Sequence, residues 1–293
     1  MVDVINYNGL MRIMYNLKDS VAFISDFKNW SEYEFDQINH LKEYANKYNL
    51  KSTLIIPIYN NEYEGIWNNK NIINLANKSN IDQIVFLYVN HFLKELDEEQ
   101  LFLRLSKELS IKKILSSKNY EFKYWKTLNV DFFKKHWQNN FLECKNLKSF
   151  KKVEELFTLI SHNDFKTFKM QTGLDYQLSG IVADGKKYGR TIGYPTINII
   201  VDSKIPLKFG VYAVKVYVEA LDKTYLGSCM YWKNSLNQIL LETYILDFDK
   251  DIYGWKVDLI FLKKIRNGIK VDSVDHLKNL IKNDVEETKK IKL

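Results

Sequence analysis

Hydrophobic positions follow two different patterns along the chain, and the first half carries one of them. Short apolar runs that predict buried strands lie at Ala22–Ser25, Ser52–Ile58, Gln83–Val89 and Ile111–Ser116. Tyr33–Tyr48 has helical spacing of apolar residues and lies between the first two runs, and a second helix is predicted after Asp97, a suitable N-cap. Strands that alternate with helices indicate a parallel sheet covered by helices.

The second half carries the other pattern, in which strand-like runs follow one another. These runs lie at Val211–Val218, Ile239–Leu246 and Lys256–Leu262, with turn-forming residues between them. Only Ser273–Lys290 is convincingly helical there, with Ser273 as its predicted N-cap and an apolar stripe along it. The pattern predicts a small antiparallel barrel followed by a helix.

Glycine marks the change between the two patterns. Only Gly9 and Gly65 precede residue 173, and the other nine of the 11 glycines lie within 173–293. A glycine-rich part needs tight turns and close backbone approaches, whereas a glycine-poor part does not. We therefore predict two domains, 1–170 and 171–293, joined by a helical segment at 151–170.

Composition narrows the class of protein. The net charge of +7 comes from lysines spread throughout, without an arginine-rich helix or zinc-finger spacing, so we expect no nucleic-acid partner, and a basic nucleic-acid-binding protein is the weakest alternative. No apolar run approaches ~18 residues, and no basic segment leads into an apolar block at the N-terminus, so we expect no transmembrane helix and no signal peptide. Cys144 and Cys229 are far apart, which fits a reducing cytoplasm. Nothing in the sequence sets an oligomeric state.

The stretch GRTIGYPTIN, residues 189–198, combines unusual flexibility with polar side chains. Gly185, Gly189 and Gly193 recur at intervals of four residues, and such a segment exposes backbone N–H groups to phosphates. Thr196 and Asn198 are two apart, so on a strand they share one face and suit Mg²⁺. Pro195 fixes the backbone directly before them. The alternative is a barrel with glycine turns and two surface polar residues.

Two charged residues farther along are further candidates. Glu242 is a single acid inside the apolar run 239–246, so it either faces solvent or accepts a proton from a substrate hydroxyl. Arg266 follows the apolar run 259–262 and is either a surface arginine or a clamp for a phosphate or carboxylate.

Taken in this order, these residues resemble a known family. Residues 173–289 look like the riboflavin kinase half of bacterial bifunctional riboflavin kinase/FMN adenylyltransferases (FAD synthetases). The matching pieces are SGIVADGKKYGRTIGYPTINI, FGVYAV, LETYILDFDKDIYG and FLKKIRNGIKVDSVDHLKNLIKND. The resemblance implies an all-β six-stranded Greek-key barrel with a C-terminal helix, which phosphorylates riboflavin to FMN with ATP.

The resemblance also implies roles for individual residues. Thr196 and Asn198 match the family's pair that holds Mg²⁺ and the nucleotide phosphates, Glu242 matches its general base, and Arg266 matches an arginine near the flavin and the phosphates. The matching residues that surround the nucleotide are Gly185, Gly189, Arg190, Gly193 and Pro195. The partners implied are small molecules only, with riboflavin and ATP as substrates.

Two positions depart from the family pattern. The family usually carries N-I-G-x-x-P-T before the glutamate strand, and here the segment 227–237 lacks the Pro-Thr and is expected to form a shorter loop. A phenylalanine usually follows the arginine by several residues, and Val271 stands there. Both changes are expected to alter flavin contacts.

The first half resembles the family's FMN adenylyltransferase domain, which implies a nucleotidyltransferase-like, Rossmann-like α/β fold. Its signature G-x-F-D-G-x-H-x-G-H is lost, because Ser31 and Glu34 stand at the two histidine positions. We therefore expect a degenerate domain without FAD synthetase activity. Two alternatives remain open: a bifunctional enzyme with a divergent adenylyltransferase site, and a flavin- or nucleotide-binding protein without catalysis.

Overall fold

The computed structural model describes residues 1–10, 17–25, 27–59, 65–117, 125, 127–144, 153–185, 188–201, 205–234 and 237–291. By its contacts the chain divides into two compact units, Met1–Tyr63 with Ile72–Lys151 and Glu64–Asn71 with Lys152–Leu293. Residues 153–170, which lie before the boundary predicted from the sequence, therefore cluster with the second unit. Among the helices that the structure describes, none has the length and apolar character needed to cross a bilayer.

The first unit is built on a parallel six-stranded sheet. Its strands are β1 (Asp3–Tyr7), β2 (Ser20–Ile24), β3 (Lys51–Tyr59), β4 (Gln83–Val89), β5 (Ile111–Ser116) and β6 (Phe141–Glu143), in the order β1-β4-β3-β2-β5-β6. All five strand pairs are parallel. Each residue of β2 is buried, as expected for a central strand with both faces covered. The predicted α/β fold is confirmed. From β2 the chain adds β3 and β4 on one side and β5 and β6 on the other, so the strand order reverses between β2 and β5.

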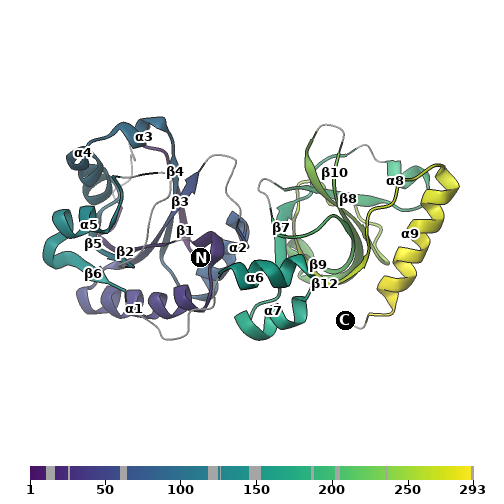
Figure 1. The fold of residues 1–293 in the computed structure, drawn as a ribbon, viewed down its shortest axis with the longest axis horizontal. Helices are drawn as coiled ribbons and strands as arrows, with labels where there is room; N and C mark the ends of the chain where they lie inside the picture. Colours follow the sequence, from purple (N-terminus) through teal and green to yellow (C-terminus); the bar gives the residue numbers. More distant parts are fainter. Residues whose placement is uncertain are drawn as a thin grey trace. The chain divides into compact units, whose positions relative to one another are not determined.

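Helices cover both faces of this sheet. They are α1 (Glu32–Tyr48), α2 (Asn69–Lys78, shared between the units), α3 (His91–Glu95), α4 (Glu98–Leu103) and α5 (Val130–Trp137), with short irregular turns η1 (Phe27–Asn29), η2 (Arg104–Glu108) and η3 (Gln138–Asn140). Figure 1 shows α1 on one side of the sheet and α4 on the other. The predicted N-cap of α4 is confirmed, because the Asp97 carboxylate accepts a hydrogen bond from the backbone N–H of Gln100 at 2.8 Å.

The second unit is an antiparallel barrel preceded by two helices. The helices are α6 (Val153–Ser161) and α7 (Phe165–Thr172), and the strands are β7 (Gln177–Ile181), β8 (Thr196–Ile200), β9 (Gly210–Val218), β10 (Lys223–Lys233), β11 (Ile239–Ile245) and β12 (Lys256–Arg266). The strand order is β7-β12-β9-β10-β11-β8, with every pair antiparallel. The run β12-β9-β10-β11 has the 4-1-2-3 order of a Greek key. A single bridge between Ala183 and Asn198 joins the two edges.

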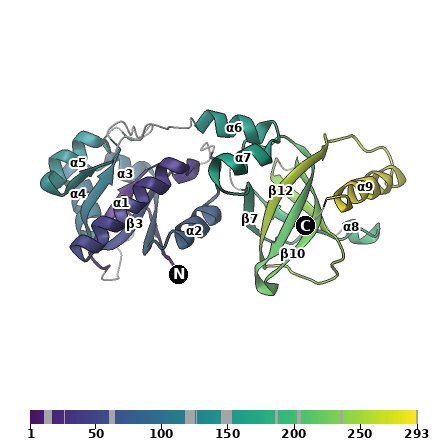
Figure 2. The ribbon, with the colours of Figure 1, turned by 90° about the horizontal axis from the view of Figure 1, so that it is seen from below.

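Two helices lie on the outside of the barrel. They are α8 (Tyr188–Thr191) and α9 (Val274–Lys289), while a short turn, η4 (Glu219–Leu221), follows β9. Helix α9 packs on β9, β10 and β12, and α8 lies on the same side of the barrel in both views (Figures 1 and 2). The Ser273 hydroxyl caps α9 by accepting from the N–H of His276 at 3.1 Å, as predicted. The predicted barrel with a C-terminal helix is confirmed.

Candidate active site

The pairing of β8 with β11 brings three predicted site residues together. Glu242 lies directly opposite Asn198, and Tyr244 lies opposite Thr196. Opposite residues of an antiparallel pair point to the same face, and so do residues two apart on one strand. Thr196, Asn198 and Glu242 therefore share one face, where the Thr196 hydroxyl donates a hydrogen bond to Glu242 Oε1 at 2.9 Å.

This face is the outer surface of the barrel. Leu241, Thr243 and Ile245 are buried, whereas Glu242 and Tyr244 between them are half-buried. The strand registers extend the outer row across five strands, and it consists of Asn198, Glu242, Met230, Val211 and Arg266. Asn198, Glu242 and Arg266 thus lie in one row on the side that carries α9.

Local geometry requires glycine at positions 185, 189 and 193. A Cβ atom on Gly185 would lie 2.3 Å from Nδ2 of Asn198, and one on Gly189 would lie 2.2 Å from the backbone oxygen of Tyr194. Gly193 has a φ of +87°, which L-residues rarely adopt. The backbone therefore folds tightly against β8 in front of Pro195, and Gly185 leaves room for the amide of Asn198.

A cavity of about 260 Å³ lies on this outer face, under α9. Four predicted residues line it: Gly189, Thr196, Glu242 and Arg266. The remaining walls are largely aromatic and aliphatic, from Tyr188, Tyr194, Tyr244, Trp232, Met230, Val211, Ile192, Val271, Leu277 and Ile281. The cavity is slightly below the ~300–1,000 Å³ common for ligand sites, and its apolar walls with a few polar groups are typical of them.

Arg266 is held by a partner that the sequence analysis did not select. Its Nε and Nη2 donate to the two carboxylate oxygens of Asp284 on α9, both at 2.7 Å, and its Nη1 donates to the backbone oxygen of Asn267 at 3.1 Å. Both side chains line the cavity. Arg266 is therefore not a free surface arginine but half of an ion pair between β12 and α9.

A second cavity of about 380 Å³ adjoins the first. Thr196 lines both, and the second cavity also contains Arg190 and Pro195 together with the segment 248–253. Arg190 forms an exposed ion pair with Asp251 at 3.4 Å, and its guanidinium lies 5.7 Å from the centre of the Tyr253 ring. Six of the nine predicted site residues thus line at least one of two cavities that share Thr196, whereas Gly185, Gly193 and Asn198 line neither.

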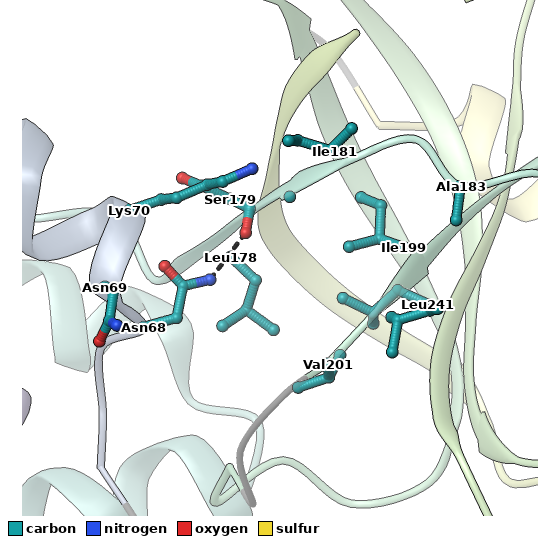
Figure 3. Close-up of a pocket in the computed structure, with 12 residues that line it drawn as sticks. Asn68, Asn69, Lys70, Leu178, Ser179, Ile181, Ala183, Ile199, Val201 and Leu241 are labelled. Carbon is teal, nitrogen blue, oxygen red and sulfur yellow. Dashed lines mark hydrogen bonds between the residues drawn. The ribbon is translucent and has the colours of Figure 1, made fainter. Parts of the chain in front are cut away.

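A third cavity, of about 400 Å³, lies in the second unit where β7 and β8 part (Figure 3). Figure 3 shows its apolar walls, and Asn68 donates from its side chain to the backbone oxygen of Ser179 at 2.7 Å. Lys70 is the one titratable residue among its described lining. None of the predicted site residues lines it.

Ser31 and Glu34, which were predicted to stand at the two signature histidine positions, lie at the start of α1, after β2. Glu34 is buried, and it accepts hydrogen bonds from the backbone N–H and the hydroxyl of Ser31 at 2.9 and 2.7 Å and from the hydroxyl of Ser25 at 3.2 Å. The bond from the N–H of Ser31 belongs to a capping box at the start of α1. Asp26, within the same stretch, lies outside the described residues.

The segment 227–237, for which a shorter loop than in the family was expected, begins inside a strand. Gly227–Lys233 belongs to β10. Ser228, Met230 and Trp232 alternate along that strand and line the first cavity. Positions 235–236 lie outside the described residues.

Comparisons with known proteins agree with this geometry. Residues 172–292 match the riboflavin kinase (flavokinase) family. The sequence is 29% identical to the bifunctional riboflavin kinase/FMN adenylyltransferase of Buchnera aphidicola subsp. Schizaphis graminum, over 96% of this chain and 98% of that one. Residues 172–292 therefore belong to the riboflavin kinase family, and along its whole length the chain is similar to bifunctional riboflavin kinase/FMN adenylyltransferases. Its second unit is a riboflavin kinase domain, as the sequence resemblance implied.

Other relatives extend the comparison. The bifunctional riboflavin kinase/FMN adenylyltransferase of Haemophilus influenzae is 41% identical over 44% of this chain and 43% of that one. Among solved structures, one described as a macrolide-efflux protein from Streptococcus pneumoniae has a TM-score of 0.69 and 22% identity, and it covers 99% of this chain and 100% of that one. At that identity the likeness shows that the two share a fold.

Proposed function

We propose that the second unit transfers the γ-phosphoryl group of ATP to the 5′-hydroxyl of riboflavin. In this step the bond from the 5′-oxygen to the γ-phosphorus forms, the bond from that phosphorus to the β–γ bridging oxygen breaks, and FMN and ADP result. Glu242 accepts the hydroxyl proton as general base. The observation that carries the proposal is the hydrogen bond from Thr196 to Glu242 at the point where two cavities meet.

The two cavities suit the two substrates. The first, with its aromatic and aliphatic walls, is the proposed flavin site, since a ring system is bound largely by apolar and stacking contacts. The second, bordered by Arg190 and the glycine-rich segment before β8, is the proposed ATP site. Because Thr196 lines both, the reacting hydroxyl and the γ-phosphate meet beside Glu242.

The donor atoms at this junction fit Mg²⁺. A hydroxyl has one hydrogen and two lone pairs, so Thr196 keeps acceptor capacity while it donates to Glu242. The side-chain oxygen of Asn198 on the same face is a second hard ligand, and Mg²⁺ usually completes its shell with phosphate oxygens and water. Bound with ATP, the ion neutralises charge on the phosphates, while the protein residues orient it.

The test is one incubation of the full chain with riboflavin, ATP and Mg²⁺, with flavins separated chromatographically. FMN is expected to accumulate in proportion to enzyme. Glu242→Gln is expected to abolish most of this product, and Glu219→Gln is the control, because Glu219 pairs with Lys256 at the surface and does not line either cavity. Flavin binding without any FMN would favour the non-catalytic alternative.

We further propose that the first unit does not make FAD. In open α/β sheets, ligands bind beyond the carboxyl ends of the strands where the strand order reverses, which here is beside β2 and β5. The helix that starts there, α1, has the buried carboxylate of Glu34 at its N-terminus. A helix N-terminus binds phosphate through free N–H groups and its positive dipole, and a carboxylate already in place opposes an incoming polyphosphate.

The corresponding test starts from FMN rather than riboflavin. With FMN, ATP and Mg²⁺, no FAD above background is expected, while a bifunctional relative assayed in parallel produces it. FAD that increases with enzyme concentration would instead support the alternative of a divergent adenylyltransferase site. The riboflavin kinase proposal does not depend on this result, because its residues lie in the second unit.

A further inference from the structure

Asp284 and Arg266 form a shielded ion pair on the wall of the flavin cavity. Their side chains are 6% and 20% exposed, and two parallel hydrogen bonds of 2.7 Å join the guanidinium to the carboxylate. Paired forks of this kind fix the orientation of an arginine as well as its charge. Asp284 comes from α9, so the helix determines where the guanidinium of Arg266 points.

The remaining donors of Arg266 are positioned for an oxyanion. A guanidinium has five N–H groups. Asp284 takes one from Nε and one from Nη2, and the backbone oxygen of Asn267 takes one from Nη1. One N–H therefore remains on each terminal nitrogen, without a partner among the described residues. Two N–H groups on neighbouring nitrogens match two oxygens of a phosphoryl group.

Two acidic residues line the cavity, so a bound phosphate needs a cation there. Glu242 and Asp284 are both acidic, and Arg266 is the one basic residue among the described residues that line the cavity. Arg266 and Glu242 lie in the same row three strands apart, which is about 14 Å of sheet at ~4.8 Å per strand. Both side chains line the same cavity. A dianionic phosphate beside Glu242 therefore depends on Arg266.

We propose that Asp284 is a positioning residue that presents the free N–H groups of Arg266 to the 5′-phosphoryl group, during its transfer and in bound FMN. This inference rests on the proposed riboflavin kinase function and extends it to a residue on α9. A purely structural role of Asp284, fastening α9 to the barrel, has a different consequence. Leu277 and Ile281 of α9 also line the cavity, so a loosened helix would lower the affinity for riboflavin and FMN alike.

The test compares two ligands that differ only by the phosphate. Kd values for riboflavin and FMN are measured on the full chain by flavin fluorescence. Asp284→Asn keeps the size of the side chain but removes the charge and one acceptor oxygen. We expect the Kd for FMN to rise about tenfold or more, since charge-assisted bonds to the phosphate lose their alignment. We expect the Kd for riboflavin to change by less than about twofold, because that ligand has no phosphate.

Two further variants complete the design. Glu287→Gln on the same helix removes an exposed carboxylate that pairs with Lys290, and it is expected to change neither Kd. Arg266→Lys keeps the positive charge but not the paired N–H groups, so it is expected to lower the affinity for FMN but not that for riboflavin. This variant tests the phosphate contact even if Asp284→Asn fails to fold. In the double variant Arg266→Lys with Asp284→Asn, the loss of affinity for FMN is expected to be no larger than in Arg266→Lys alone, because Asp284 is proposed to act through Arg266.

Any one of three results overturns the proposal. They are an equal loss of affinity for riboflavin and FMN in Asp284→Asn, an unchanged affinity for FMN in Arg266→Lys, and additive losses of FMN affinity in the double variant. The first assigns Asp284 to fastening the helix, the second removes the phosphate contact, and the third shows that Asp284 does not act through Arg266. Failure of the proposed function looks different, because then the wild-type chain itself forms no FMN.

Discussion

Gly185→Ala perturbs the site by a distance that the structure defines. The new Cβ atom would lie 2.3 Å from Nδ2 of Asn198, whereas ordinary contacts begin at 3.4 Å. The amide of Asn198 must therefore move by 3.4 − 2.3 = 1.1 Å, or the backbone at Gly185 must move instead. A displacement of ~1 Å in a positioned group can cost about 100-fold in rate. We expect turnover with riboflavin and Mg²⁺·ATP to fall by roughly that factor.

The assay for Gly185→Ala is FMN formation at saturating substrates, with a thermal melt to show that the barrel remains folded. Gly268→Ala is the matched control, because a Cβ atom there meets nothing within 4 Å and its φ lies outside the left-handed range. Raising the Mg²⁺ concentration is expected to recover part of the lost rate if Asn198 is a metal ligand. Wild-type turnover in Gly185→Ala would show that the amide of Asn198 needs no fixed position.

Three other predictions concern the proposed metal ligands, the proposed base and the two buried cysteines. Thr196→Ala and Asn198→Ala are each expected to lower turnover by ~100-fold or more with little change in the melting temperature, because each removes a proposed ligand of the metal on the transferred phosphate; wild-type rates in both would contradict this role. Glu242→Gln is expected to bind riboflavin and ATP almost normally but to turn over about 10²–10⁴-fold more slowly, as measured by binding titrations beside single-turnover kinetics; loss of flavin affinity with normal turnover would make it a binding residue. Burial raises the pKa of the thiols of Cys144 and Cys229 to about 12. Their protonated forms favour the folded state, so stability is expected to fall as pH rises from about 9 toward 12, and neither thiol is expected to react with a thiol reagent at pH 8 until the chain unfolds.

Much of the fold follows from local sequence patterns. The strands at Gln83–Val89, Ile111–Ser116 and 239–245 were predictable because each is an apolar run of strand length between polar or turn-forming residues. The N-caps Asp97 and Ser273 were predictable because their short acceptor side chains precede amphipathic segments. These features depend on residues close together in the chain.

Features that depend on distant pairing were harder to predict. The strand Gly227–Lys233 mixes polar, small and aromatic residues, and only its ladders with β9 and β11 fix it as extended. Asp284 is polar beside the predicted apolar stripe of α9, so sequence alone favours a solvent-exposed role. Its burial is explained by Arg266, which lies 18 residues earlier and meets it only in the folded barrel.

Glu34 shows that a readable local signal was overlooked. The sequence Ser31-Glu-Tyr-Glu34 is the S-x-x-E pattern of a capping box at the start of a helix. The sequence comparison treated Glu34 only as the replacement of a histidine. The structure gives it a second role, because the carboxylate caps α1 and is buried there. A residue that was predicted to stand at a signature histidine position is thus also part of a helix cap.

The central claim is that this chain transfers the γ-phosphoryl group of ATP to riboflavin and performs no adenylyl transfer. Isotope labelling tests both parts in one measurement, because a kinase moves the γ-phosphorus into the flavin and an adenylyltransferase moves the α-phosphorus. Riboflavin is incubated with the enzyme and with ATP labelled at either position, and radioactivity is counted in the separated flavins. We expect γ-label in FMN and no α-label in any flavin. Flavin without γ-label, or flavin carrying α-label, would contradict it.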